Sequence, residues 1–117
     1  MDFDGALKAH NDWKVKLRAA IANRQKVDAA TLGKDNVCPL GSWLHGDARA
    51  RFGALPTYQR CVAEHAAFHR EASKVAQAIN AERYVEADKL LAAGSEYSTV
   101  SQRVGVAIVA LRREAKV

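Results

Sequence analysis

The sequence predicts an all-α protein, built as an antiparallel four-helix bundle with three long helices and one short helix. Apolar residues make up 49% of the 117-residue chain, proline occurs only twice, and alanine and charged residues are abundant. This composition is typical of helical domains, and nothing in it suggests strands. Apolar residues also recur every three or four positions over long stretches that short or moderate loops would join. The length fits one domain, which we place at residues 1–117.

The first long helix is predicted over residues 3–24. Asp2 and Asp4 lie where a helix cap and the helix dipole favour negative charge. One face of the helix carries apolar residues at helical spacings, with a histidine in the same stripe: Phe3, Leu7, His10, Leu17 and Ile21.

A polar connector and the short helix follow. Residues 25–37 include Gly33, so we expect a connector with room for one helical turn. Pro39 suits the first position of a helix, which should run to residue 44 or 45 and end at Gly46. Cys38 is then the N-cap of this helix. We expect a loop from there to residue 56.

Two further long helices are predicted in the second half of the chain. The segment 57–79 has one largely apolar face: Tyr58, Cys61, His65, Phe68, Ala72, Val75 and Ile79. A tight corner at residues 80–81 leads into the last helix, over residues 82–114, where Gly94 and Ser95 mark a place to bend. Its expected inward positions are Tyr84, Ala87, Leu91, Ser98, Val104, Ile108 and Leu111.

Three histidines and one cysteine indicate a metal site. His65 and His69 are four residues apart, so on a helix their side chains leave the same face one turn apart. Free backbone N–H groups and the helix dipole favour a thiolate at Cys38, and the thiolate is the form that binds metal. Taken alone, His10 is better explained as a core histidine with a hydrogen-bond partner. Together the four side chains make a complete tetrahedral set for Zn2+.

The neighbours of these residues leave alternatives open. Cys61 lies four residues before His65 on the same predicted face, so it is available as a ligand, as a small buried hydrophobe, or as a resolving thiol after oxidation. His45 is expected to be exposed. Gly41 would let the short helix approach its neighbours closely, and Trp43 would anchor its underside in the core.

The combined motif resembles that of the chemoreceptor zinc-binding domain (CZB) family. The signature of that family is a histidine, a Cys-x-aliphatic-Gly-x-aromatic core and a closing His-x-x-x-His. The matching residues here are His10, Cys38-Pro-Leu-Gly-Ser-Trp43 and His65-Ala-Ala-Phe-His69. The resemblance covers essentially the whole chain. It implies a three-histidine, one-cysteine zinc site in a helical bundle, with ligands His10, Cys38, His65 and His69.

The same resemblance implies a function in bacterial signalling. Members of this family are regulatory modules of chemoreceptors and diguanylate cyclases, and are sometimes found alone. They sense zinc itself or oxidants such as hypochlorous acid through the zinc-bound cysteine. By this resemblance we also expect a homodimer. The alternative is a zinc-stabilised helical module that mediates protein contacts without sensing anything.

Other function classes fit the sequence less well. Four protein ligands close a zinc site to catalytic water, and residue 66 is alanine, so the His-Glu-x-x-His pattern of hydrolases is absent. We therefore expect no enzymatic activity. A diiron or haem enzyme would need inward carboxylates, whereas Glu64 and Glu71 lie off the histidine face.

Charge and hydropathy argue against nucleic acid and membrane partners. The net charge is +5, but the basic residues are dispersed and form no stripe with aromatics. The longest apolar run, Val104–Leu111, is too short to span a bilayer. The N-terminus lacks the pattern of a secretory signal, so we expect a cytoplasmic protein with reduced thiols.

Overall fold

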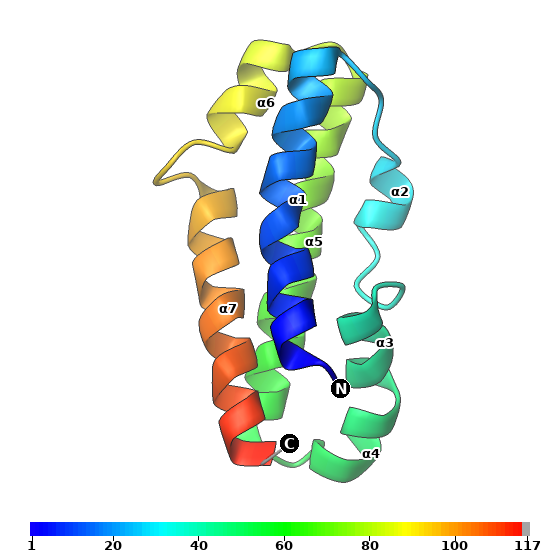
Figure 1. The fold of residues 1–117 in the computed structure, drawn as a ribbon, viewed down its shortest axis with the longest axis vertical. Coiled ribbons are helices and arrows are strands. Elements are labelled where there is room, and N and C mark those ends of the chain that lie inside the picture. The colour runs from blue at the N-terminus through cyan, green and yellow to red at the C-terminus, as the bar shows by residue number, and fades with distance from the viewer. Residues whose placement is uncertain (116–117) are drawn as a thin grey trace.

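The computed structural model, which describes residues 1–115, confirms the predicted all-α bundle (Figure 1). Within these residues the chain forms seven helices and no strand: α1 (Phe3–Asn23), α2 (Ala29–Leu32), α3 (Pro39–His45), α4 (Asp47–Phe52), α5 (Pro56–Asn80), α6 (Tyr84–Leu90) and α7 (Glu96–Ala115). None of these helices has the length and apolar character needed to cross a membrane.

The bundle is organised around α5. This helix packs most extensively against α7 and also contacts α1, α2, α3 and α6. The long helices α1, α5 and α7 run side by side, while the short helices α2, α3 and α4 follow one another along one edge (Figure 1). The position of the fourth helix in the bundle is therefore taken by three successive short helices. The sequence predicted one short helix after a connector.

The segment 46–56 was predicted as a loop, and this prediction was wrong. It contains α4, because Gly46 both ends α3 and begins the next helix. Asp47 supplies negative charge in the first turn and lies 3.5 Å from the guanidinium of Arg51, one turn later. Ala48 is completely buried, so α4 gains a tertiary contact as well as local stabilisation.

The last predicted helix is interrupted rather than bent. Residues 91–95 separate α6 from α7, and Gly94 adopts a left-handed conformation with φ of 82°. Ser95 then starts the new helix, because its side-chain oxygen accepts a hydrogen bond from the backbone N–H of Ser98. The interruption changes the helical phase, so Tyr97 is buried where Ser98 was expected.

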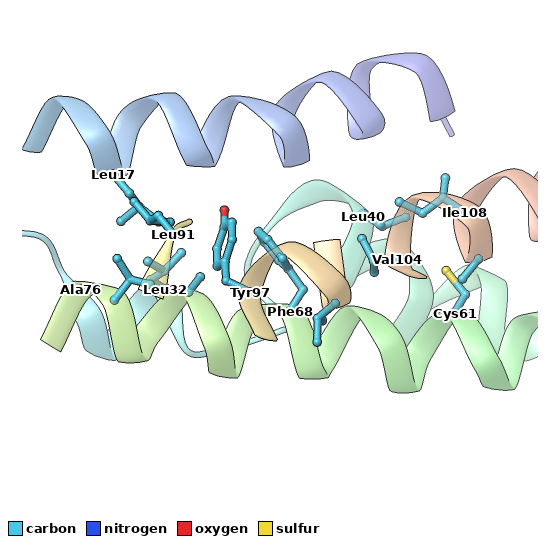
Figure 2. Packing of buried hydrophobic residues seen from close by; sticks show 14 of the residues in the cluster. Leu17, Leu32, Leu40, Cys61, Phe68, Ala76, Leu91, Tyr97, Val104 and Ile108 are labelled. Carbon is cyan, nitrogen blue, oxygen red and sulfur yellow. The ribbon is translucent and has the colours of Figure 1, made fainter. Parts of the chain in front are cut away.

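The hydrophobic core contains side chains from all sides of the bundle. Figure 2 shows side chains from α1, α3, α5 and α7, together with Leu32 and Leu91, meeting in one cluster. Phe68 on α5 packs against Tyr97 on α7, with 5.4 Å between ring centres. Cys61 is fully buried in this cluster, which confirms its prediction as a small buried hydrophobe.

Side chains of α5 hold the connector after α1 in place. Asn80 makes two hydrogen bonds to the backbone of Val27: its carbonyl oxygen accepts from the N–H at 2.8 Å, and its amide donates to the carbonyl at 2.7 Å. Ser73 donates to the carbonyl of Ala29. The predicted single helical turn in this connector is α2, which begins at the side-chain cap of Asp28. These contacts bring α2 and the following segment alongside α5.

Candidate metal centre

Cys38 caps the N-terminus of α3, as predicted. Its Sγ accepts a hydrogen bond from the backbone N–H of Gly41 at 3.3 Å. Gly41 is buried, and a Cβ at this position would overlap the carbonyl oxygen of Asp35 and approach the ring of His65 to 3.1 Å. The absence of a side chain at Gly41 therefore allows α3 to approach α5 closely enough for Cys38 to reach the histidines.

Three donor atoms converge between α3 and α5. His65 and His69 are buried one turn apart on α5, and their Nε2 atoms lie 3.0 Å from each other. The Sγ of Cys38 lies 3.3 Å from Nε2 of His65 and 3.7 Å from Nε2 of His69. The donor atoms of Cys38, His65 and His69, which we call the donor group, all lie within 4.8 Å of one another.

The spacing of the donor group fits a tetrahedral zinc ion. Bonds of about 2.05 Å to nitrogen and about 2.3 Å to sulfur, at tetrahedral angles, place two nitrogens about 3.3 Å apart and a sulfur and a nitrogen about 3.6 Å apart. The observed separations of 3.0, 3.3 and 3.7 Å differ from these values by only a few tenths of an ångström. Small side-chain adjustments are therefore enough to bring all three atoms to one ion.

Hydrogen bonding sets the orientation of His69. Its Nδ1 lies 2.7 Å from the backbone carbonyl of Leu32, and because a carbonyl only accepts, Nδ1 must donate. The lone pair of His69 is then on Nε2, which faces the donor group, as in metal-binding histidines whose second nitrogen is hydrogen-bonded. Nδ1 of His65 is buried and has no partner within the described residues.

Burial keeps these imidazoles neutral. It lowers the pKa of His65 to about 3, with a further contribution from His69, while the carboxylate of Asp35 acts in the opposite direction. Burial also lowers the pKa of His69, and the carbonyl of Leu32 opposes this effect. At neutral pH both rings are in the form that donates a lone pair to a metal.

His10 lies near the donor group but outside it. Its ring is buried on α1, packs on Phe68 with 3.8 Å between ring centres, and has Nε2 3.3 Å from the hydroxyl oxygen of Ser101. Burial, with a contribution from His69, lowers the pKa of His10 to about 4. The structure thus brings together three of the four predicted ligands, and the role of His10 as the fourth stays a prediction.

One cavity connects the four predicted ligands to the surface. Its volume is about 340 Å³, and its walls come from α1, α3 and α5, with His10, Cys38, His65 and His69 all on its lining. Trp13 and Phe68 form part of its apolar wall. Cys38 is only partly buried and lies on the lining of this cavity.

The remaining predicted candidates lie elsewhere. Cys61 is outside the donor group, and burial raises the pKa of its thiol to about 12. This geometry does not support Cys61 as a ligand, and its role as a resolving thiol stays a prediction. His45 is exposed, as expected, and its Nε2 lies 3.0 Å from the carboxylate of Asp35.

Sequence reasoning missed three contacts around the site. These are the Leu32 carbonyl, the carboxylate of Asp35 and the hydroxyl of Ser101. A backbone carbonyl leaves no signal in a sequence, and Ser101 is separated from His10 by 91 positions. Only Asp35, which lies close to the Cys38 motif, was available to a sequence-based search.

Comparison with known proteins agrees with this geometry. Residues 10–76, more than half of the chain, match the family model described as the chemoreceptor zinc-binding domain. No curated protein and no solved structure matches the chain. The matched segment begins at His10 and extends beyond His69, so it contains all four predicted ligands, and zinc is the ion that the donor group is suited to hold. The chain therefore belongs to the chemoreceptor zinc-binding domain family and is a zinc-binding signalling domain.

Proposed function

We propose that this protein is a sensory domain of bacterial signalling that responds to zinc or to an oxidant such as hypochlorous acid through Cys38. The ligands in this proposal are His10, Cys38, His65 and His69. The observation that carries it is the convergence of one accessible thiol, at the start of a seven-residue helix, on two buried imidazoles of α5.

The short helix α3 is the element that the site controls. A helix of seven residues is unstable alone, because its few hydrogen bonds do not offset the cost of nucleation. Its position therefore depends on tertiary contacts, and the contact of Cys38 with α5 is one of them. Bound zinc would supply a tetrahedral link from α3 to α5 and, through His10, to α1.

Oxidation would break this link at the sulfur. The thiolate of Cys38 attacks the chlorine of hypochlorous acid, and hydroxide leaves. Water then hydrolyses the sulfenyl chloride and releases chloride. The sulfur loses two electrons and becomes a sulfenic acid, which is a poor metal ligand. The cavity between α1 and α3 offers a small oxidant a route to Cys38, whereas Cys61 is 0% exposed. The response is therefore specific to one of the two thiols.

The experiment combines metal analysis with controlled oxidation. We expect about one zinc per chain by elemental analysis of the purified protein, weaker binding in Cys38→Ser, and unchanged binding in the control Cys61→Ser. Equimolar hypochlorous acid should release the zinc to a chromophoric chelator, with sulfenic acid trapped at residue 38 and detected by mass spectrometry. Retention of zinc by chains that carry the trapped sulfenic acid would contradict the proposal.

The same experiment separates sensing from a purely structural role of zinc. A sensory domain should change its helix arrangement on oxidation while it stays folded, so circular dichroism should show largely retained helix together with altered near-ultraviolet signals of Trp13 and Trp43. If zinc only stabilises an interaction module, oxidation should leave these signals unchanged or unfold the chain completely.

The cellular setting belongs to the same proposal. By analogy with its family, the domain would act in the cytoplasm as a homodimer, alone or joined to a chemoreceptor or diguanylate cyclase output domain. We also propose that it is not an enzyme, since four protein ligands leave no position for a catalytic water. The nearby carboxylates of Glu64 and Glu71 pair with Arg103 and Lys74, which supports this assignment.

A further inference from the structure

A hydrogen bond links His10 to a helix that carries none of the predicted ligands. The hydroxyl of Ser101 on α7 lies 3.3 Å from Nε2 of His10 on α1. Ser101 is half-buried and lies beyond residues 10–76, which match the family. The contact therefore extends the surroundings of the metal centre to α7.

A metal-binding histidine needs a partner for its second nitrogen. One ring nitrogen gives its lone pair to the ion, and the other keeps a proton that requires an acceptor when the ring is buried. His69 shows this arrangement, because its Nδ1 donates to the carbonyl of Leu32. For the imidazole ring of His10, the hydroxyl of Ser101 is the one hydrogen-bond partner within residues 1–115.

The hydroxyl of Ser101 is placed to pair with a proton on Nε2 of His10. The hydroxyl oxygen can accept a hydrogen bond from Nε2. Phe68 packs against the ring of His10, with 3.8 Å between ring centres and 49° between the ring planes.

We propose that Ser101 is the positioning residue of the metal centre, which accepts the Nε2 proton of His10 and leaves Nδ1 free to bind zinc. This inference rests on the proposed role of His10 as the fourth ligand. The hydrogen bond would also couple α7 to the metal centre, although α7 supplies no ligand. A shift of His10 on zinc binding would be transmitted to α7 through Ser101.

The test measures zinc affinity by competition with a chromophoric chelator. Ser101→Ala should weaken binding 10- to 100-fold, the usual effect of removing an outer-shell partner. Ser101→Thr keeps the hydroxyl and should restore most of the affinity. Thr99→Ala is the matched control, because Thr99 is exposed on the same helix and, among residues 1–115, its hydroxyl bonds only to the carbonyl of Ser95. Helix content and the thermal stability of the metal-free protein should remain unchanged in all three variants.

A double-mutant cycle identifies the residue through which Ser101 acts. In a His10→Ala background, Ser101→Ala should have no further effect on zinc affinity. Cobalt spectra supply a second readout. The sulfur-to-cobalt charge-transfer band should persist in Ser101→Ala, while the visible ligand-field bands change as they do in His10→Ala.

Three outcomes would overturn the inference or its basis. Wild-type affinity in Ser101→Ala, together with weaker binding in His10→Ala, refutes positioning by Ser101 and leaves the ligand assignment intact. If Ser101→Ala lowers zinc affinity equally in the wild type and in the His10→Ala background, Ser101 acts independently of the His10 ring. Wild-type affinity in His10→Ala shows that the proposed fourth ligand itself is wrong.

Discussion

Replacement of Gly41 by alanine should disrupt the metal centre through one added methyl group. The Cβ would overlap the carbonyl oxygen of Asp35, which belongs to the backbone and cannot simply rotate away. It would also lie 3.1 Å from the ring of His65. Either α3 or the segment around Asp35 must move, and either movement shifts Cys38 relative to α5.

The magnitude follows from two opposing effects. Alanine in place of glycine favours the helix by up to about 1 kcal/mol. Overpacking against a neighbouring backbone costs about 1 to 3 kcal/mol or more. We therefore expect a net loss of about 1 to 2 kcal/mol in the free energy of unfolding, and at least a tenfold loss of zinc affinity, because the sulfur no longer meets both imidazoles.

Gly105 provides a matched control for this substitution. It lies in the middle of α7, and a Cβ there would meet nothing within 4 Å. Gly105→Ala should therefore raise the free energy of unfolding by about 0.5 to 1 kcal/mol and leave zinc affinity unchanged.

The assay is urea unfolding of both variants with added zinc and with a strong chelator, alongside competition measurements of zinc affinity. We expect the free energy of unfolding to fall in Gly41→Ala and to rise in Gly105→Ala. If Gly41→Ala is as stable as the wild type and binds zinc equally well, then close approach of α3 to α5 is not what assembles the site.

Three further predictions concern the scaffold. Asn80→Ala removes both hydrogen bonds to the backbone of Val27, which are part-buried, so the free energy of unfolding measured in urea should fall by about 1 to 3 kcal/mol. A loss below about 0.5 kcal/mol would contradict this role. The stability of the metal-free protein should be nearly constant between about pH 7 and 8 and decline between about pH 6.5 and 4, by up to about 1.4 kcal/mol per pH unit for each histidine. The reason is that the unfolded chain then binds protons that His10 and His65, with pKa values of about 4 and 3, do not; denaturation curves that do not change over this range would refute it. Arg112→Ala should cost less than 1 kcal/mol despite its 2.8 Å contact with Asp4, because both side chains are exposed; a larger loss of thermal stability would show that this pair is more than a surface contact.

Local features of the sequence predicted most of the helices and the donors. Pro39 and Cys38 mark the start of α3, and the four-residue spacing of His65 and His69 places both on one face of α5. These relations depend only on residues within one turn of each other, which helical geometry fixes. The same kind of reasoning failed at Gly46, where one residue ends a helix and begins another.

Spacing along a helix predicts which residues share a face, but not where a neighbouring element meets that face. Cys61 and His69 are both four residues from His65, yet only His69 joins the donor group. Gly41 lies close to the backbone at Asp35 and to the ring of His65, and α3 packs against α5 at a level that brings Cys38 to both His65 and His69.

The sequence by itself determined the helical class, the cap at Cys38 and the identity of the candidate zinc ligands, since these depend on residue type and local periodicity. Tertiary structure decided which donors converge, that Cys61 is excluded, and that Ser101 is the partner of His10 across 91 positions. Such contacts result from the packing of whole helices, and no pattern within a single helix contains that information.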